Sequence, residues 1–295
     1  MDGILLLNKP QNMTSHDCVN KVRKIFKTKK VGHLGTLDPD VTGVLPIAIN
    51  RATKIIQFLD QANKEYLAEV KIGFSTVTED ASGEVLECDN SIKSISNQQL
   101  NVVLQSFIGK QKQTPPLISA VKVQGKRLYE YARENKIVER LPRDIEIFDI
   151  ELLSEAGDFV GQEITFIITV KCSKGTYIRT LATDIGKSLG YPAHLNKLIR
   201  LKSGKFPLNQ SYTFTDIEKG NFELISLYDA LESYHRVLAS DQMKADIKHG
   251  KKISYQLNKF TLIVFYDIFK QVLAVYEPDK NNQGLIKPVR VLFSE

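Results

Sequence analysis

The sequence predicts an α+β fold with one large domain and one small one. Helical and strand-like hydrophobic patterns alternate along the chain, their spacing is not that of regular strand–helix–strand units, and no internal repeat is present. With 295 residues, of which 42% are hydrophobic, the chain can bury a substantial core and divide into two domains.

The first predicted elements are a strand and a capped helix. Residues 3–7 are largely apolar and predict a short strand, which a turn at residues 8–10 ends. Thr14 or Ser15 can cap the helix, because either side-chain oxygen can accept a hydrogen bond from a backbone N–H of the first turn. The apolar positions that follow have helical spacing and are Val19, Val22, Ile25 and Phe26.

The middle of the chain alternates strands and helices. Apolar side chains at every second position from residue 66 predict a strand with one buried face. Ser96 precedes an amphipathic helix, and Gly190 ends another. The predicted order is a strand at residues 66–74, a helix at 100–107, strands at 145–153 and 163–171, and a helix at 180–189.

The pattern changes after residue 232, where short β-rich runs replace the longer elements. These runs cover residues 260–266, 271–276 and 287–292. They predict a small, partly closed β domain at residues 233–295, after a main domain at residues 1–232. An extension of the main sheet by the same strands is the alternative.

Composition excludes several classes of protein. No apolar run is long enough to cross a bilayer, and the chain does not begin with a basic stretch followed by an apolar one, so we expect a cytoplasmic location and no membrane contact. Three distant cysteines predict neither a disulfide framework nor a metal site, and the histidines show no ligand spacing. We therefore expect no metal and no cofactor.

Basic residues gather just before the most informative motif of the chain. The net charge of +6 is modest, but residues 21–30 contain six lysines and arginines and no acid. Such a segment can attract a phosphate backbone. A solvated helix face with no ligand is the alternative interpretation.

The motif itself is a loop built around one carboxylate. Residues 32–46 surround Asp38 with glycine and proline on both sides, which predicts an irregular and tightly specified backbone. Functional side chains are often presented on such loops.

This loop closely resembles the motif of the TruB family, whose members convert uridine 55 in the T loop of tRNA to pseudouridine. The resemblance extends over nearly the whole main domain. The matching segments are residues 7–10 with Lys9-Pro10, 64–66 with Tyr66, 78–83, 115–133 with Lys122, 172–180 with Tyr177 and Arg179, and 193–201 with Leu198. Two positions depart from the family pattern: Val77 replaces an Asp and Ile199 replaces an Arg. These departures put secondary RNA contacts in doubt.

The resemblance implies a fold and a reaction. The fold is a pseudouridine synthase domain with a central mixed or antiparallel sheet flanked by helices, followed by a PUA-like RNA-binding domain. The reaction cleaves the N1–C1′ bond, turns the uracil and rejoins it through C5. Asp38 is the expected catalytic carboxylate, as nucleophile or as stabiliser of a cationic sugar. Arg179 is its expected partner and lowers its pKa.

The remaining implied roles concern the RNA. Tyr66 is expected to stack on the detached uracil, and Leu198 to wall the same pocket. The target base must be extruded from the tRNA elbow, and His33 is expected to fill the vacated place. Lys9, Tyr177 and Lys122 complete the expected RNA-contacting set. The expected partner is tRNA, with no protein partner and a monomeric enzyme.

Two other functions remain open at this level. An RNA-binding or RNA-folding protein would equally explain the basic segment and the β-rich tail. A retaining glycoside hydrolase or N-glycosylase could also use an Asp in a turn, although it normally needs a second carboxylate as acid.

Overall fold

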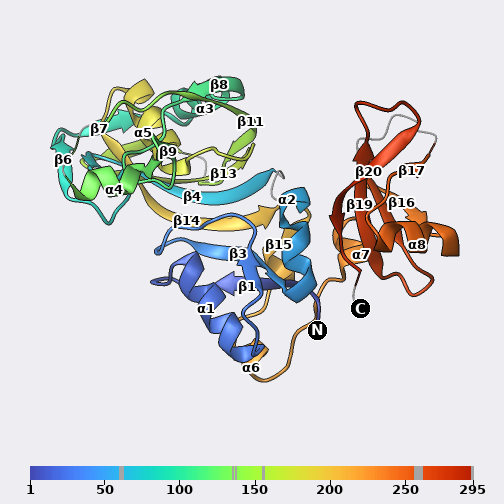
Figure 1. Cartoon of the computed structure of the whole chain (residues 1–295). Helices are drawn as coiled ribbons and strands as arrows, with labels where there is room; N and C mark the ends of the chain where they lie inside the picture. The colour runs from blue at the N-terminus through green and yellow to red at the C-terminus, as the bar shows by residue number, and fades with distance from the viewer. Residues whose placement is uncertain (60–62, 135, 137, 155–156, 256–261, 294–295) are drawn as a thin grey trace.

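A nine-stranded mixed sheet forms the centre of the computed structural model, which describes residues 1–59, 63–134, 136, 138–154, 157–255 and 262–293 (Figure 1). The strand order is β1-β3-β14-β4-β13-β11-β8, with β2 paired to β3 and β15 to β14. All pairs are antiparallel except β14 with β3. The strands are β1 (Gly3–Lys9), β2 (Val31–His33), β3 (Thr42–Ile49), β4 (Lys64–Ile72), β8 (Gly109–Gln113), β11 (Arg143–Leu152), β13 (Ile164–Cys172), β14 (Ala193–Ser203) and β15 (Phe206–Pro207).

Several helices pack against this sheet, and one packs against the C-terminal strands. Thr14 caps the first helix and Gly190 ends the fifth in a left-handed conformation, as the sequence predicts. The backbone N–H of Thr14 also donates to the Asp17 carboxylate. The helices are α1 (Ser15–Ile25), α2 (Ile56–Leu59), α3 (Asn97–Ser106), α4 (Leu128–Arg133), α5 (Ile178–Leu189), α6 (Phe214–Glu218), α7 (Leu227–Ala230) and α8 (Asp241–Lys248), with 3-10 turns at Asn50–Ile55 and Leu208–Gln210.

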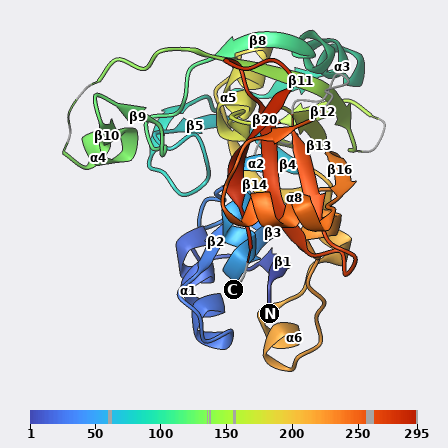
Figure 2. The same cartoon turned by 45° about the vertical axis from the view of Figure 1, so that its right-hand side comes forward.

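Three short hairpins or bridged pairs extend from the sheet. In Figure 2, β9, β10 and α4 project to one side of the molecule. The predicted strand at 66–74 is divided, because Gly73, with φ of +133°, ends β4 and Phe74 begins β5. The pairs are β5 (Phe74–Thr76) with β6 (Val85–Cys88), β7 (Lys93–Ile95) with β12 (Phe159–Gly161), and β9 (Lys122–Val123) with β10 (Lys126–Arg127).

A separate five-stranded sheet forms the C-terminal part, in the order β16-β18-β19-β20-β17. It does not extend the main sheet, so the alternative of a continued sheet is wrong. Figure 1 shows it beside the main sheet. Its strands are β16 (His235–Leu238), β17 (Ile253–Ser254), β18 (Ile263–Tyr266), β19 (Val272–Pro278) and β20 (Leu285–Val291). Residues 260–261 of the predicted run 260–266 lie outside the described residues.

The strand β1 is apolar on both faces because both faces are covered. Leu5 and Leu7 pack in a core with α1, whereas Ile4 and Leu6 pack in a second core. That second core also contains Val264 and other residues of the C-terminal sheet. A strand buried on both faces reads as a continuous apolar run, which explains the pattern of residues 3–7.

Candidate functional site

Asp38 lies in an irregular loop between β2 and β3, as its glycine and proline neighbours predict. A hydrogen bond and a close approach of two backbone segments hold this loop. The backbone N–H of Leu37 donates to Ser15 Oγ at 2.8 Å. Gly43 adopts φ of +114°, and a Cβ there would lie 2.4 Å from the carbonyl oxygen of Arg200. Only glycine therefore fits where the loop enters β3.

The buried side chain of Lys9 also holds the Asp38 loop in place. Its side chain is fully buried, and Nζ donates to the carbonyl oxygens of Pro10, Met13 and Pro39 at 2.6–2.8 Å. Pro39 directly follows Asp38. The expected RNA contact of Lys9 is therefore wrong for this structure: the ammonium group faces the interior and positions the loop. Burial lowers the pKa of Lys9, an effect that nearby Cys18, Asp40 and Asp38 oppose.

Arg200 is a second buried cation that holds the loop, and the sequence analysis did not assign it a role. It is 1% exposed and lies on β14. Its guanidinium donates to the carbonyl oxygens of Val44, Thr36 and Gly35 at 2.9, 3.4 and 3.2 Å. The sequence carried no signal for this role, because only the structure shows that position 200 is buried, where an arginine needs several acceptors.

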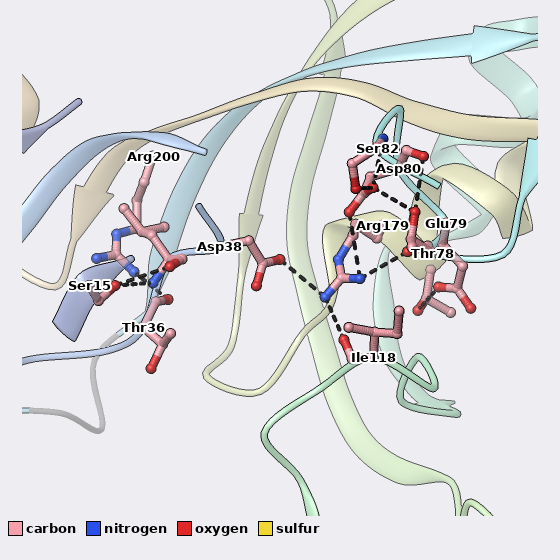
Figure 3. Close-up of polar contacts among 12 residues, drawn as sticks. Ser15, Thr36, Asp38, Thr78, Glu79, Asp80, Ser82, Ile118, Arg179 and Arg200 are labelled. Atoms are coloured by element: carbon pink, nitrogen blue, oxygen red, sulfur yellow. Dashed lines mark hydrogen bonds and ion pairs between the residues drawn. The ribbon is translucent and has the colours of Figure 1, made fainter. Parts of the chain in front are cut away.

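Arg179 joins three segments beside Asp38 (Figure 3). It lies in the first turn of α5 and its side chain is 6% exposed. Nη2 is 3.1 Å from Asp38 Oδ2 and donates to the carbonyl oxygen of Ile118, while Nη1 donates to that of Thr78. The predicted partnership of Asp38 and Arg179 is thus present in the structure.

Asp80 is the second carboxylate of the site, and its contact with Arg179 was not predicted. Its Oδ2 is 3.6 Å from Arg179 Nη1. Its Oδ1 accepts hydrogen bonds from Thr78 Oγ1 and from the backbone N–H and hydroxyl of Ser82 (Figure 3). Both oxygens of this carboxylate are therefore engaged, one with hydroxyl and backbone donors and the other with a guanidinium.

Arg179 lowers the pKa of Asp38, as expected, but the net pKa of the carboxyl group is nevertheless raised. The side chain keeps 46% of its surface exposed towards the cavity, but protein surrounds the carboxylate on its other sides. Burial raises the pKa most, Arg179 lowers it, and the charge of Asp80 raises it further. The guanidinium therefore offsets the cost of burying the carboxylate only in part.

A cavity of about 270 Å³ opens at Asp38 and brings most of the predicted residues together. Its lining includes Asp38, Tyr66, Tyr177, Arg179 and Leu198. A neighbouring cavity of about 690 Å³ shares Asp38, Arg179 and Leu198 with it. Apolar, aromatic and charged groups thus converge on one carboxylate, as expected of a site for a nucleobase attached to a sugar.

The two tyrosines enter the cavity from different elements. Tyr66 lies on β4 and is 9% exposed; burial raises the pKa of its hydroxyl, and Arg200 opposes this rise. Tyr177 caps α5, where its backbone N–H and carbonyl both bond the side-chain amide of Gln113. Burial also raises its pKa. Both phenols therefore stay protonated at neutral pH.

The remaining predicted positions lie outside the lining of this cavity. His33 ends β2, opposite Ile47 of β3. Lys122 is exposed on the β9–β10 hairpin. Of the two departures from the family pattern, Ile199 lines the neighbouring cavity, and Val77 is 47% exposed beside the Thr78–Asp80 segment. The expected RNA roles of His33 and Lys122 stay predictions.

The basic segment lies away from the cavity. The carbonyl of Lys30 accepts a hydrogen bond from Asn50, which directly follows β3, whereas the Asp38 loop joins the opposite end of that strand. The eight residues of β3 span roughly 25 Å at the usual rise of a strand. Proximity in sequence to Asp38 was therefore no guide to proximity in space.

Comparisons with known proteins agree with this geometry. Residues 23–178 match the model of the TruB family pseudouridylate synthase N-terminal domain, and residues 179–234 that of the tRNA pseudouridylate synthase B C-terminal domain. The chain is 46% identical over 301 residues to tRNA pseudouridine synthase B of Bacillus cytotoxicus, covering 100% of this chain and 98% of the relative. It is 45% identical over 303 residues to the protein of the same name from Halalkalibacterium halodurans, covering 100% and 99%.

A solved structure has the same fold. A chain from the crystal structure of a Cbf5-Nop10-Gar1 complex superposes with a TM-score of 0.73 and 26% identity, over 99% of this chain and 85% of that one. The family models together cover well over half of the chain, and the relatives match along its whole length. The chain therefore belongs to the TruB family of pseudouridylate synthases.

Proposed function

We propose that this protein converts uridine 55 in the T loop of tRNA to pseudouridine. One observation carries the proposal: a single carboxylate, Asp38, stands at a cavity walled by Tyr66 and Leu198 and is ion-paired with Arg179. Full-length similarity to tRNA pseudouridine synthase B from two organisms supports the choice of tRNA as substrate.

The proposed reaction needs few protein groups, because it is an isomerisation. The N1–C1′ bond breaks, a C5–C1′ bond forms, the proton on C5 leaves and N1 gains one. Asp38 in its ionised form assists the cleavage, as carboxylates do in glycoside hydrolysis. Tyr66 holds the detached uracil by stacking, and Leu198 closes the pocket. No cofactor enters this scheme.

The structure favours this reaction over glycoside hydrolysis. A hydrolase needs a protonated carboxyl group to protonate the leaving group. Asp80, which shares Arg179 with Asp38, accepts hydrogen bonds from Thr78 and Ser82, so its two oxygens are already engaged with protein groups.

The wider proposal concerns the whole molecule. We propose a cytoplasmic monomer that extrudes the target base with the help of His33 and whose C-terminal sheet is a PUA-like RNA-binding domain beginning near residue 233. Among the residues that the structure describes, no helix combines the length and the apolar character needed to cross a bilayer.

The deciding experiment compares the protein with its Asp38→Asn variant on unmodified tRNA transcript, without metal or nucleotide. We expect pseudouridine at position 55 alone, and a rate at least about 10⁴-fold lower with the variant. A transcript carrying cytidine 55 is the matched negative control. Tight tRNA binding without product from the unmodified protein would favour an RNA-binding role instead.

A further inference from the structure

A groove of about 740 Å³ adjoins the catalytic cavity, and no role has been assigned to it so far. Ser173 and Lys174 line both spaces, so the two are continuous at this turn. Residues of β8 and of the start of β11 line the groove. These strands lie at one end of the main sheet (Figure 1). All of its lining side chains except Ile145 are polar. We call it the β8 groove.

Two lysines of β8 are available to a ligand, because their ammonium groups are not paired with the acids next to them. Lys110 and Lys112 are both exposed and, being two residues apart, lie on the same face of the strand. Glu146 and Asp144 stand directly opposite them in register on β11. Nevertheless, within the described parts of the chain neither lysine forms an ion pair or a hydrogen bond.

A neighbouring cross-strand pair shows that a lysine of this sheet can form an ion pair with the acid opposite it. Lys171 of β13 and Asp149 of β11 are also cross-strand partners, and their charged groups lie 2.7 Å apart. Lys110 and Lys112 also have acids opposite them in register, but among the described residues they form no ion pair with these acids. Their ammonium groups are therefore available to an anion from outside the chain.

The chemistry of the β8 groove matches that of a polynucleotide. Lysine ammonium groups bind phosphates, while Asp144 and Glu146 can accept hydrogen bonds from the amino groups of bases. A target nucleotide in the catalytic cavity is covalently joined to neighbours on both sides. Lys174, at the junction of the two spaces, marks one path along which the chain can leave.

We propose that the β8 groove binds RNA nucleotides adjacent to the target uridine, with Lys110 and Lys112 contacting their phosphates. This inference rests on the proposed function, because it takes the same RNA as ligand. It adds a binding surface to the catalytic cavity, and its contribution is to affinity, since neither lysine reaches the reacting bond.

The test is a charge-matched comparison of two double variants. Lys110→Gln with Lys112→Gln removes the groove lysines, whereas Lys187→Gln with Lys219→Gln removes two exposed lysines at the ends of α5 and α6. We measure the Kd for tRNA transcript at several salt concentrations, and the single-turnover rate at saturating RNA. For the groove variant we expect a Kd about tenfold higher and a salt slope smaller by roughly 1.4–1.8, with the rate within about twofold of that of the unmodified protein.

The outcomes separate this inference from the proposed function. Equal Kd values and salt slopes for the two double variants would overturn the proposal that the β8 groove binds RNA. Binding that weakens in the groove variant alone supports it, even if the unmodified protein makes no pseudouridine, a result that would count only against the proposed reaction.

A crosslinking experiment fixes the position of the RNA. A photoreactive group attached to cysteine in Lys112→Cys, in a Cys88→Ser background that removes the exposed native thiol, labels nearby nucleotides. The proposal requires crosslinks within a few nucleotides of uridine 55. Crosslinks confined to the acceptor stem would contradict it.

Discussion

Asp38 experiences opposing electrostatic influences, and their balance sets the pH range of activity. Burial and the charge of Asp80 raise its pKa, while Arg179 lowers it. The net pKa lies above the ordinary value, so the carboxylate gains its proton at a higher pH than an exposed Asp does. If the ionised form is the active one, turnover falls as the pH drops through this raised pKa.

Replacing Asp80 by Asn is expected to move the acidic limb of the pH–rate profile to lower pH. The substitution removes a negative charge, so the pKa of Asp38 falls and the ionised form persists in more acidic solution. Single-turnover rates in a series of acidic to neutral buffers measure the shift. Asp149→Asn, which removes an exposed acid on β11, is the control and leaves the limb in place. Movement to higher pH would contradict this and show that Asp80 acts mainly by holding Arg179.

Asp38→Asn is expected to raise the Tm at pH 7. Because the pKa of Asp38 is raised in the folded protein, the ionised carboxylate destabilises the fold at any pH above both its folded and unfolded pKa values. The penalty disappears below the unfolded pKa of about 3.9, so the gain in Tm should shrink to zero as the pH falls to that value. Arg179 retains Asp80 and the carbonyls of Thr78 and Ile118. Thermal melts from pH 3.5 to 7 test this; a lower Tm at pH 7 would mean that the ion pair outweighs burial.

The catalytic pair could be predicted from the sequence, but the residues that support it could not. Asp38 and Arg179 occupy family motifs, and the structure places them 3.1 Å apart. Lys9 was expected to contact RNA and Arg200 was assigned no role, because a local motif carries no information about burial. Their roles appear only when the Asp38 loop folds over them and offers carbonyl oxygens as acceptors.

At the scale of elements, the conformation of the Asp38 loop depends on the buried side chain of Lys9. Lys9→Met is expected to lower the free energy of unfolding by about 2–4 kcal/mol, because the carbonyls of Pro10, Met13 and Pro39 lose their donor. Turnover should fall as well, since Pro39 is adjacent to Asp38. Chemical denaturation and single-turnover rates measure the two effects.

Lys122→Met is the matched control for this prediction. Lys122 is exposed on a hairpin, so the same chemical change there should leave stability within about 0.5 kcal/mol. An RNA-contacting Lys9 would behave in the opposite way: its loss would weaken tRNA binding and leave unfolding unchanged.

Local signals predicted the elements well where caps and periodicity agree. The Thr14 cap, the Ser96 cap and the Gly190 terminus all stand at the ends of predicted helices. The strand β16 was missed, since four residues with a histidine and an arginine carry little pattern of their own. Its pairing with β18, parallel and distant in sequence, is a tertiary property.

At the scale of the whole molecule, the two sheets share a hydrophobic core. Ile4, Leu6 and Ile55 of the main part pack in one cluster with Val264 and Val275 of the C-terminal sheet. The change of composition after residue 232 predicted a domain boundary. It did not indicate how much apolar surface the two parts bury against each other. The shared cluster indicates that the two parts depend on one another for stability.

Removal of residues 233–295 is therefore expected to destabilise the remaining chain. The truncation exposes Ile4, Leu6 and Ile55 to water, and each fully buried side chain of this size contributes about 1.5–3 kcal/mol by its burial. The full chain should unfold in one transition when followed by both far-ultraviolet circular dichroism and tyrosine fluorescence, whereas the truncated chain should melt at a markedly lower temperature or aggregate. A truncated chain with the Tm of the full protein would establish the main sheet as an independent folding unit. In that event the boundary near residue 233 would separate two domains in stability as well as in sequence, and the C-terminal sheet could be lost at a cost to RNA affinity alone.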